Sequence, residues 1–327
     1  MQIQQIDFRK YKGLRELSVQ TTGINVVTGR NNAGKSTFLS ALRLLDAALS
    51  YARRRSPYIV ETHTGKRHGY VVPTENLPIS LENIHTDLEE VETVVDFHLG
   101  KDVIMTLYFP IDKGCVFFIQ GMMAPRTPSS FKKVFPFRII QIPVLGPLEH
   151  EESLVTEATL KRGVGTHRAS RHFRNYWYRN PEGFSKFQDL ITNTWEGMAV
   201  ERPELYTSLK GSELHMFCTE FRRTRELYWC GFGFQIWCQL LTHISRAVPK
   251  DILIVDEPET YLHPTVQRQL LSILRKTETQ VFMATHSATI IASALADEVM
   301  GIDRNQNTEQ RYEDTGVSLC RKLELLP

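Results

Sequence analysis

A glycine-rich stretch near the amino terminus has the residue types that bind phosphate groups. It matches the pattern GxxxxGK[ST], and its residues are Gly29, Arg30, Asn31, Asn32, Ala33, Gly34, Lys35, Ser36 and Thr37. In this pattern the glycines let backbone N–H groups curl around phosphates, the lysine reaches the β- and γ-phosphates, and the serine hydroxyl faces Mg²⁺. The sequence therefore predicts that the chain binds a nucleoside triphosphate.

The segments on either side of this loop fit a place between a strand and a helix. The apolar run Ile24–Val27 precedes it, and large apolar residues recur at helical spacing after it. These residues are Phe38, Leu39, Leu42, Leu45 and Leu49. Because a chance glycine-rich turn would lack this context, we interpret residues 29–37 as a phosphate-binding loop (P-loop).

Two carboxylates and a histidine follow predicted strands in the last third of the chain. Asp256 and Glu257 come directly after the apolar run 251–255, and His286 follows the run 279–284. Ligands of an open α/β sheet lie at the carboxyl ends of its strands. We therefore expect Asp256 to hold Mg²⁺ through water, Glu257 to polarise the attacking water, and His286 to hydrogen-bond a γ-phosphate. A lone histidine is more often structural, but this position favours a functional role.

The order of these pieces, with the P-loop and Asp256 far apart in the chain, resembles the ABC-type ATPase heads of the SMC and RecF class. The run Ile6–Leu14 is similar to the strand that opens such heads, and Arg9 falls where they carry a nucleotide-contacting arginine. The resemblance implies an α/β head of two lobes, with a mixed antiparallel sheet, a parallel core sheet and a helical insertion. It also implies ATP and Mg²⁺ as ligands.

Three blocks resemble the OLD-like (overcoming lysogenization defect) branch of these ATPases, namely residues 29–36, 256–264 and 284–287. In that family the Leu-His-Pro stretch is the D-loop, which implies that His263 lies near a subunit interface; simple helix capping is the alternative. OLD proteins continue into a TOPRIM nuclease domain, for which the residues after Ser287 leave no room. We therefore expect a standalone ATPase subunit or an amino-terminal portion of a longer protein.

ABC-type heads hydrolyse ATP between two subunits, and a signature segment of one subunit caps the nucleotide of the other. The candidate is Gly231-Phe232-Gly233-Phe234-Gln235, followed by apolar residues at helical spacing. Its N–H groups and helix dipole would favour a partner's γ-phosphate. The segment departs from the family pattern, because Trp229 and Cys230 stand where a serine is usual. An ordinary tight turn before a helix is the alternative for Gly231 and Gly233.

The resemblance also implies a Q-loop, whose glutamine contacts Mg²⁺ and the attacking water, and Gln141 is the candidate. It stands in a strand-like run, Phe137–Pro143, where a glutamine is as often only a polar position. The nearby residues Glu149, His150, Glu151 and Glu152 form a contiguous cluster. They would surround a whole helix, so a solvated helix start is favoured over a metal site.

Residues 161–180 form a basic stretch that contains no aspartate or glutamate. On a helical wheel Arg168, Arg171 and Arg174 share one face, while Phe173 and Trp177 share the other. Such a face can bind the phosphates of DNA or RNA, or an acidic partner protein. A solvated helix paired with acids elsewhere and an arginine that reaches the ATP site are the alternatives.

The remaining patterns outline the domain organisation. Alternating apolar residues at 95–99, 103–109 and 115–119 predict an antiparallel meander, and the polar, basic residues 53–78 predict an exposed loop. We divide the chain into residues 1–140 as the first part of the head, 141–245 as a helical insertion, and 246–327 as its last part.

Bulk properties bound the class of protein. The chain has 327 residues, a net charge of +2 and 42% hydrophobic residues, which suit one large or two small domains. No stretch reaches the ~20 apolar residues of a membrane span, and a signal peptide is not evident, so we expect a cytoplasmic protein. Cys115, Cys218, Cys230, Cys238 and Cys320 form no CxxC pair and are expected to be reduced thiols.

The leading hypothesis is an ATP-driven homo-oligomeric switch that passes its state to a separate effector. The resemblance suggests anti-phage defence, in which a partner supplies a nuclease or toxin. A DNA-repair head of the RecF or SMC type is one alternative, although no heptad-repeat arms are present. A non-hydrolysing scaffold that sequesters a toxin is another, and an ABC transporter subunit is the weakest.

Overall fold

The computed structural model describes residues 1–62, 65–81, 84–86, 91–100, 102–111, 114–121, 124–163, 166, 169–208, 211–302 and 310–311. The chain divides into two compact units. Unit 1 contains Met1–Ile139, Lys250–Ile254 and Gln280–Pro327, and unit 2 contains Ile140–Pro249 and Val255–Thr279. No helix in the described part of the chain is long and apolar enough to cross a bilayer.

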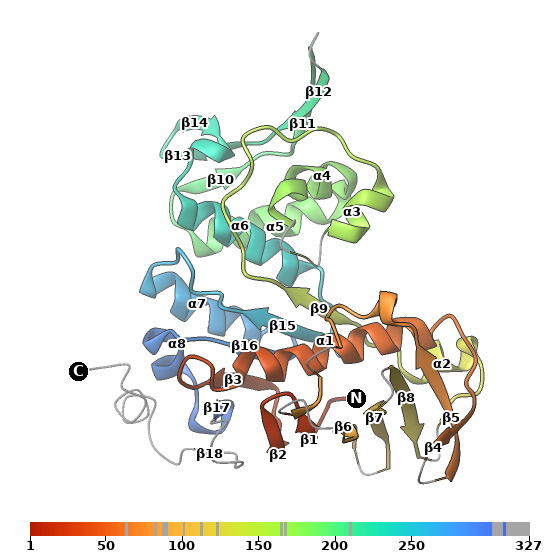
Figure 1. Cartoon of the computed structure of the whole chain (residues 1–327). Helices are drawn as coiled ribbons and strands as arrows, with labels where there is room; N and C mark the ends of the chain where they lie inside the picture. The colour runs from red at the N-terminus through yellow and green to blue at the C-terminus, as the bar shows by residue number, and fades with distance from the viewer. Residues whose placement is uncertain are drawn as a thin grey trace. The chain divides into compact units, whose positions relative to one another are not determined.

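Unit 1 contains a seven-stranded antiparallel sheet in the order β2-β1-β6-β7-β8-β5-β4 (Figure 1). Its strands are β1 (Gln5–Tyr11), β2 (Leu14–Gln20), β4 (Tyr58–Thr62), β5 (Gly65–Val72), β6 (Thr93–His98), β7 (Ile104–Phe109) and β8 (Cys115–Gln120). In β6 the side chains of Val95 and Phe97 alternate with half-buried polar residues, because successive strand residues point to opposite faces. The predicted meander is confirmed as β6-β7-β8.

A second sheet, of six strands in the order β18-β17-β3-β16-β15-β9, carries the predicted chemistry at its strand ends. Its strands are β3 (Ile24–Thr28), β9 (Ile139–Ile142), β15 (Ile252–Asp256), β16 (Gln280–Ala284), β17 (Val299–Gly301) and β18 (Gln310–Arg311). β3 runs parallel to both β16 and β17. The first four residues of β15 and all five of β3 are buried, as expected for strands covered on both faces.

Helix α1 (Lys35–Ala52) packs against both sheets within unit 1. The ring of Phe38 lies 5.5 Å from that of Phe8 on β1 and 6.0 Å from that of Phe282 on β16. All three rings are buried in one continuous core. Burial of a phenylalanine contributes about 1.5–3 kcal/mol, so this contact fixes the start of α1, where the P-loop ends.

Most described residues between 53 and 78 are exposed or half-buried, as predicted, but the prediction of a loop was wrong for most of this segment. Strands β4 and β5 form a hairpin at the edge of the seven-stranded sheet, and a 3-10 turn, η1 (Thr74–Asn76), follows. The basic cluster at residues 66–68 lies on the exposed first half of β5, while Tyr70 and Val72 are buried. The charges dominate the composition of this segment, but its two apolar anchors decide its structure.

Unit 2 is a helical unit with two small sheets (Figure 1). Its helices are α3 (Glu157–Gly163), α4 (Phe173–Arg179), α5 (Phe184–Thr194), α6 (Phe232–Ser245) and α7 (Pro264–Arg275). Strands β10 (Met198–Val200), β13 (Phe217–Glu220) and β14 (Arg223–Glu226) form one sheet, and β11 (Glu204–Ser208) pairs with β12 (Gly211–His215). Helix α6 is buried along most of its length, with Trp237 fully enclosed.

The basic stretch is not one exposed amphipathic helix. The described part contains α3, the 3-10 turn η3 (Ala169–His172) and α4, and Arg168 lies outside the described residues. The guanidinium of Arg174 is fully buried and pairs with Glu226 at 2.8 Å and with Glu152 at 3.4 Å. Arg174 therefore cannot contribute to a basic surface, and that prediction was wrong for this residue.

The acidic run at residues 149–152 is likewise not a helix start. It is irregular in structure, and the carboxylate of Glu152 is buried, where it accepts hydrogen bonds from the N–H groups of Arg174 and Asn175. Arg171 pairs with Glu149 at 3.1 Å, and both side chains are exposed. Glu152 therefore anchors the start of α4, while Glu149 and Glu151 are exposed.

Candidate nucleotide-binding site

The P-loop curls as its sequence pattern predicts. The ammonium of Lys35 donates hydrogen bonds to the carbonyl oxygens of Gly29 at 2.8 Å and Arg30 at 3.0 Å, which folds the loop around that side chain. Gly34 has a φ of +113°, and a Cβ on Gly29 would lie only 2.4 Å from the carbonyl oxygen of Ile302. Both positions therefore require glycine.

The exposure of the loop residues suits a phosphate ligand and Mg²⁺. Asn31, Asn32 and Ser36 are exposed, Thr37 is half-buried and Ala33 is buried. The loop leads directly into α1, so the N–H groups of the first helical turn and the positive end of the helix dipole lie where phosphates would bind. The hydroxyl of Thr28, at the end of β3, is buried without a hydrogen-bond partner. The residues present therefore fit a nucleoside triphosphate with Mg²⁺ at Ser36.

His286 leaves the sheet beside this loop. Ala284 on β16 is in register with Val27 on the parallel strand β3, and the N–H of Thr285 donates to the carbonyl of Val27 at 3.2 Å. The Ser287 hydroxyl then caps helix α8 (Ala288–Ser293) by accepting from the N–H of Ile290 at 3.1 Å. Within unit 1, the structure thus brings half-buried His286 to the same sheet edge as the P-loop.

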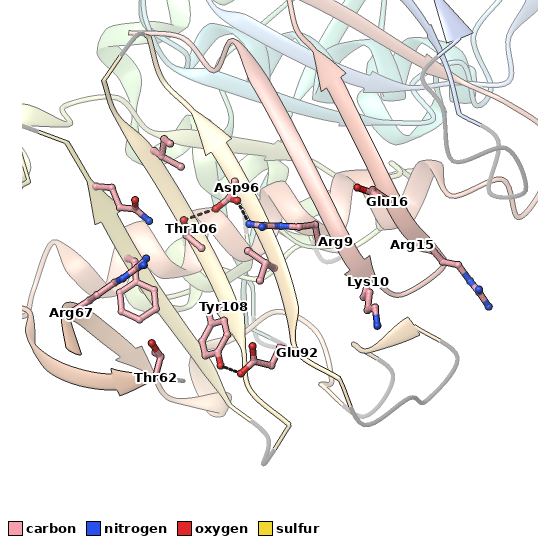
Figure 2. A pocket seen from close by; sticks show the side chains of 14 residues that line it. Arg9, Lys10, Arg15, Glu16, Thr62, Arg67, Glu92, Asp96, Thr106 and Tyr108 are labelled. Carbon is pink, nitrogen blue, oxygen red and sulfur yellow. Dashed lines mark hydrogen bonds and ion pairs between the residues drawn. The ribbon is translucent and has the colours of Figure 1, made fainter. Parts of the chain in front are cut away.

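Arg9 lies on the other side of the antiparallel sheet from the core. Phe8 points to α1, whereas Arg9 reaches across to an ion pair with Asp96 on β6, as Figure 2 shows. The two residues line a cavity of about 650 Å³ on the outer sheet face, and no P-loop residue lines it. Nucleotide contact by Arg9 stays a prediction, and it would require this side chain to leave Asp96.

The hairpin of β1 and β2 touches the P-loop at a different residue. A Cβ on Gly34 would meet the Cδ2 atom of Leu14 at 3.1 Å, so Leu14 packs directly against the loop. Lys12, in the turn of this hairpin, is half-buried, and burial lowers the pKa of its ammonium. The sequence analysis did not name Lys12 as a candidate site residue. Its position two residues before Leu14, the first residue of β2, was the signal that the sequence offered.

Asp256 is the last residue of strand β15 and Glu257 follows it; both belong to unit 2, which includes the chain from Val255 to Thr279. Glu257 has a φ of +44°, and its carbonyl oxygen accepts a hydrogen bond from the Thr260 hydroxyl at 3.1 Å. A non-glycine residue in this left-handed region is strained, and such strain concentrates at functional sites. Both acids line a small cavity whose other residues include Ile142, Pro143, Leu145 and two α6 residues, Ile236 and Leu240.

Gln141 and His263 occupy different environments in unit 2. Gln141 is half-buried on β9, which neighbours β15 in the sheet order, directly before two residues of that small cavity. His263 is the N-cap of α7, where its ring nitrogen accepts from the N–H of Thr265 at 3.3 Å. The structure therefore shows His263 in the capping role, and its nearness to a subunit interface stays a prediction.

The signature candidate is the start of helix α6, with Gly231 as its N-cap. A Cβ on Gly233 would lie 2.9 Å from the carbonyl oxygen of Tyr261, so the helix start packs against the D-loop segment. The amide of Gln235, fully buried, donates to the carbonyl oxygens of Tyr228 at 2.7 Å and Cys230 at 2.9 Å. The residues before the helix are therefore held in a defined conformation.

The predicted residues thus fall into two groups. The P-loop, Arg9 and His286 belong to unit 1, and Asp256, Glu257, Gln141, Gly231 and Gly233 belong to unit 2. Among the described residues, no three or more histidine, cysteine or acidic side chains gather as a metal-binding group. Mg²⁺ bound with phosphates keeps several waters and needs only one or two protein ligands. The roles of Ser36, Asp256 and Gln141 as its ligands stay predictions.

Comparison with known proteins shows what this chain is similar to. Residues 147–292 match the family model described as "AAA domain, putative AbiEii toxin, Type IV TA system". Among curated proteins no sequence matches the chain.

Solved structures match over nearly the whole chain. An Smc head bound to the C-terminal winged-helix domain of ScpA is 13% identical with a TM-score of 0.59, covering 95% of this chain and 98% of that chain. An Smc head with an extended coiled coil, bound to the C-terminal domain of ScpA derived from Pyrococcus furiosus, is 12% identical with a TM-score of 0.53, covering 99% and 98%. The chain has the fold of an SMC head domain. The predicted fold class is thereby confirmed.

Proposed function

We propose that this chain is an ATP-binding and ATP-hydrolysing switch of the OLD/RecF-like group. The observation that carries the proposal is the P-loop, in which the Lys35 ammonium donates to the Gly29 carbonyl oxygen. His286 follows β16, the strand that pairs with β3 directly before this loop. This arrangement suits a triphosphate and not a single phosphate, because Lys35 and His286 offer donors at the γ end.

In this proposal the chain's residues divide the work. N–H groups of residues 31–37 bind the phosphates, while Ser36 and Asp256 hold Mg²⁺ with help from Gln141. The metal neutralises charge that develops on the phosphate oxygens. Glu257 accepts a proton from the attacking water as general base, and His286 donates a hydrogen bond to the γ-phosphate.

We further propose that the site is completed by a second copy of the chain, through Gly231 and Gly233 at the start of α6. Three aromatic side chains next to these glycines support this, because Trp229, Phe232 and Tyr261 are 66%, 51% and 58% exposed. The rings of Phe232 and Tyr261 lie 5.8 Å apart in an edge-on pair. Exposed aromatic groups of this kind mark protein interfaces.

The biological role of the chain is also a proposal. The family description names a putative toxin and a type IV toxin–antitoxin system. We propose a role in prokaryotic defence in which a separate effector protein responds to the state of this chain. A DNA-repair head of the RecF or SMC type is the second candidate. The likeness to SMC heads favours it equally, since it spans nearly the whole chain.

The test is molecular mass by light scattering, measured without nucleotide, with ATP and Mg²⁺, and with ATP on Glu257→Gln, alongside phosphate release. We expect ATP to increase the mass, and Glu257→Gln to bind ATP, to stay assembled and to lose turnover by about 100-fold or more. Glu259→Gln, two residues further along the same motif, is the matched control and should keep its turnover. The proposal would be refuted if the molecular mass is the same with and without ATP and if Glu257→Gln releases phosphate as fast as the wild type.

The same trapped variant separates the two biological settings. Retention of a fluorescent DNA duplex by Glu257→Gln only when ATP is present would favour the repair head. Assembly with ATP but no DNA retention at physiological salt would favour the effector switch.

A further inference from the structure

Two cysteines that are distant from the P-loop residues in sequence meet in the interior of unit 2. The Sγ atoms of Cys218 and Cys230, twelve positions apart, lie 2.8 Å from each other. Both residues are free thiols and buried, at 0% and 8% exposure. A disulfide needs a separation of about 2.05 Å, so these sulfurs are within a small adjustment of bonding distance. Cys115 and Cys238 are also free and buried, and Cys320 lies outside the described residues.

The two thiols belong to segments of different rigidity. Cys218 is on β13, the middle strand of its sheet, in register with Val200 on β10 and Arg225 on β14. Cys230 stands in an irregular segment directly before Gly231, the N-cap of α6. Strand β13 is paired along both edges, whereas the backbone of Cys230 is held only by its N–H bond to the Leu227 carbonyl and by the Gln235 amide on its own carbonyl. A bond between the sulfurs would therefore move Cys230 toward Cys218 more than the reverse.

We propose that Cys218 and Cys230 form a reversible disulfide that shifts the start of α6 and slows ATP turnover. The regulatory half rests on the proposed function of Gly231 and Gly233, whereas the bond itself does not. The sulfurs must approach by about 0.7 Å. Because Cys230 adjoins Gly231, that movement is passed directly to the N–H groups proposed to meet a partner's γ-phosphate.

The oxidant is a small peroxide, which can enter where a protein disulfide cannot. One thiolate attacks a peroxide oxygen, which yields a sulfenic acid and, after protonation, one water from hydrogen peroxide. The second sulfur then attacks the sulfenic sulfur, forms the S–S bond and expels a second water. In total the two thiols lose two protons and two electrons, which reduce one hydrogen peroxide to two waters.

The surroundings of the pair favour Cys230 as the first sulfur to react. The hydrogen bond between the two thiols lowers the pKa of Cys230, and the Arg225 charge acts in the same direction, against burial and the charges of Glu220 and Glu226. The same hydrogen bond, together with burial, raises the pKa of Cys218. The thiolate is the nucleophile, so the group with the lower pKa reacts first.

The experiment uses the full chain, treated with hydrogen peroxide and then alkylated in denaturant for peptide mass spectrometry. We expect a Cys218–Cys230 crosslinked peptide, two hydrogens lighter than the two free peptides, that dithiothreitol reverses. Phosphate release should fall several-fold on oxidation and recover on reduction. Cys218→Ala should keep full turnover after peroxide, and Cys238→Ala, which removes a third buried thiol of unit 2, should still form the link and lose turnover.

The outcomes separate this proposal from the proposed function. Peroxide that oxidises the chain without producing the 218–230 link would overturn the disulfide. A link that forms while turnover stays constant would overturn the regulatory half. If the reduced protein has no ATPase activity, the proposed function fails by itself, and the link is then scored by the mass spectrum and by a higher melting temperature of the oxidised protein.

Discussion

Glu257 combines an expected catalytic role with an unfavourable backbone conformation. Its φ of +44° lies in the left-handed region, which costs a non-glycine residue on the order of 1 kcal/mol or more. The Thr260 hydroxyl and N–H both donate to its carbonyl oxygen and so help to hold this conformation. The chain therefore gives up stability at the position where a general base is needed.

This trade-off leads to a prediction for Glu257→Gly. Glycine adopts the left-handed region without strain, so we expect the melting temperature to rise by a few degrees at most, while phosphate release falls to background. Glu278→Gly is the matched control, because Glu278 is exposed and has a φ of +53°. It should gain similar stability and keep its turnover. A Glu257→Gly variant that melts earlier than the wild type would show that this conformation is not strained.

Arg174 gives a second prediction, on stability alone. Its removal leaves the buried carboxylate of Glu152 and the nearly buried carboxylate of Glu226 without their cation. We expect Arg174→Ala to lose about 3–5 kcal/mol in denaturant unfolding, as for other broken buried ion pairs. Arg171→Ala, which breaks only the exposed pair with Glu149, should lose less than about 1 kcal/mol. Equal losses in both variants would contradict the buried network.

These residues also show where the sequence was sufficient. The P-loop was predictable because Gly29, Gly34, Lys35 and Ser36 stand at positions that phosphate chemistry or backbone shape restricts to one or two residue types. Arg174 was not, because its partner Glu226 is 52 positions away in the chain and the wheel placed it among exposed arginines. Local periodicity carries no signal for such a partner. The same reason hid the approach of Cys218 to Cys230.

Helix α6 was predictable as an element, and one of its buried residues makes unit 2 sensitive to acid. Burial lowers the pKa of His243 to about 3, so the folded state keeps this imidazole neutral, and the Arg246 charge acts in the same direction. The unfolded state binds a proton near pH 6.5. The stabilisation is complete above that pH and is lost as the pH falls from 6.5 toward 3.

At pH 5 the expected cost is about 2 kcal/mol relative to pH 7, from 1.36 kcal/mol for each pH unit below 6.5. We therefore expect the unfolding free energy of the wild type to fall more between these pH values than that of His243→Gln, which cannot titrate. Denaturant titrations of both proteins at pH 7, 6 and 5 measure the difference. Parallel pH curves would mean that His243 is protonated in the folded state.

Elements whose own residues show a clear period were predicted, whereas elements that depend on pairing with a distant strand were not. The meander β6-β7-β8 and helix α1 follow from periods of two and 3.6 in their own residues. The hairpin of β4 and β5 was missed because its pairing with β8 supplies order that a basic, turn-rich composition does not reveal. The three-part division of the chain stays a prediction, while contacts group the chain into two units, each assembled from separate segments.

At the scale of the whole molecule, the proposed switch depends on a surface that one chain leaves uncovered. Trp229, Phe232 and Tyr261 are exposed beside Gly231, although water-exposed aromatic rings give up the burial that stabilises most others in this chain. The simplest physical reason is that another molecule covers them. In the proposed ATP-bound assembly that molecule is a second copy of the chain, and the rings would bury their apolar surface at the same moment as the glycines meet its nucleotide.

The last prediction follows from this coupling between aromatic burial and nucleotide capping. Phe232→Ala with Tyr261→Ala should weaken ATP-dependent assembly by about tenfold or more, because two interface aromatics commonly contribute more than 1 kcal/mol each. Binding of ATP to the single chain should be unchanged, since the P-loop consists of other residues.

Phe221→Ala is the control: Phe221 is 72% exposed, lies in the turn between β13 and β14, and has no proposed role in assembly. Light scattering over a dilution series with ATP, on the Glu257→Gln background that prevents turnover, gives the dissociation constants. If the double variant and the Phe221 control assemble equally well, the second copy does not bind at the start of α6, and the signature role of Gly231 and Gly233 must be given up with it.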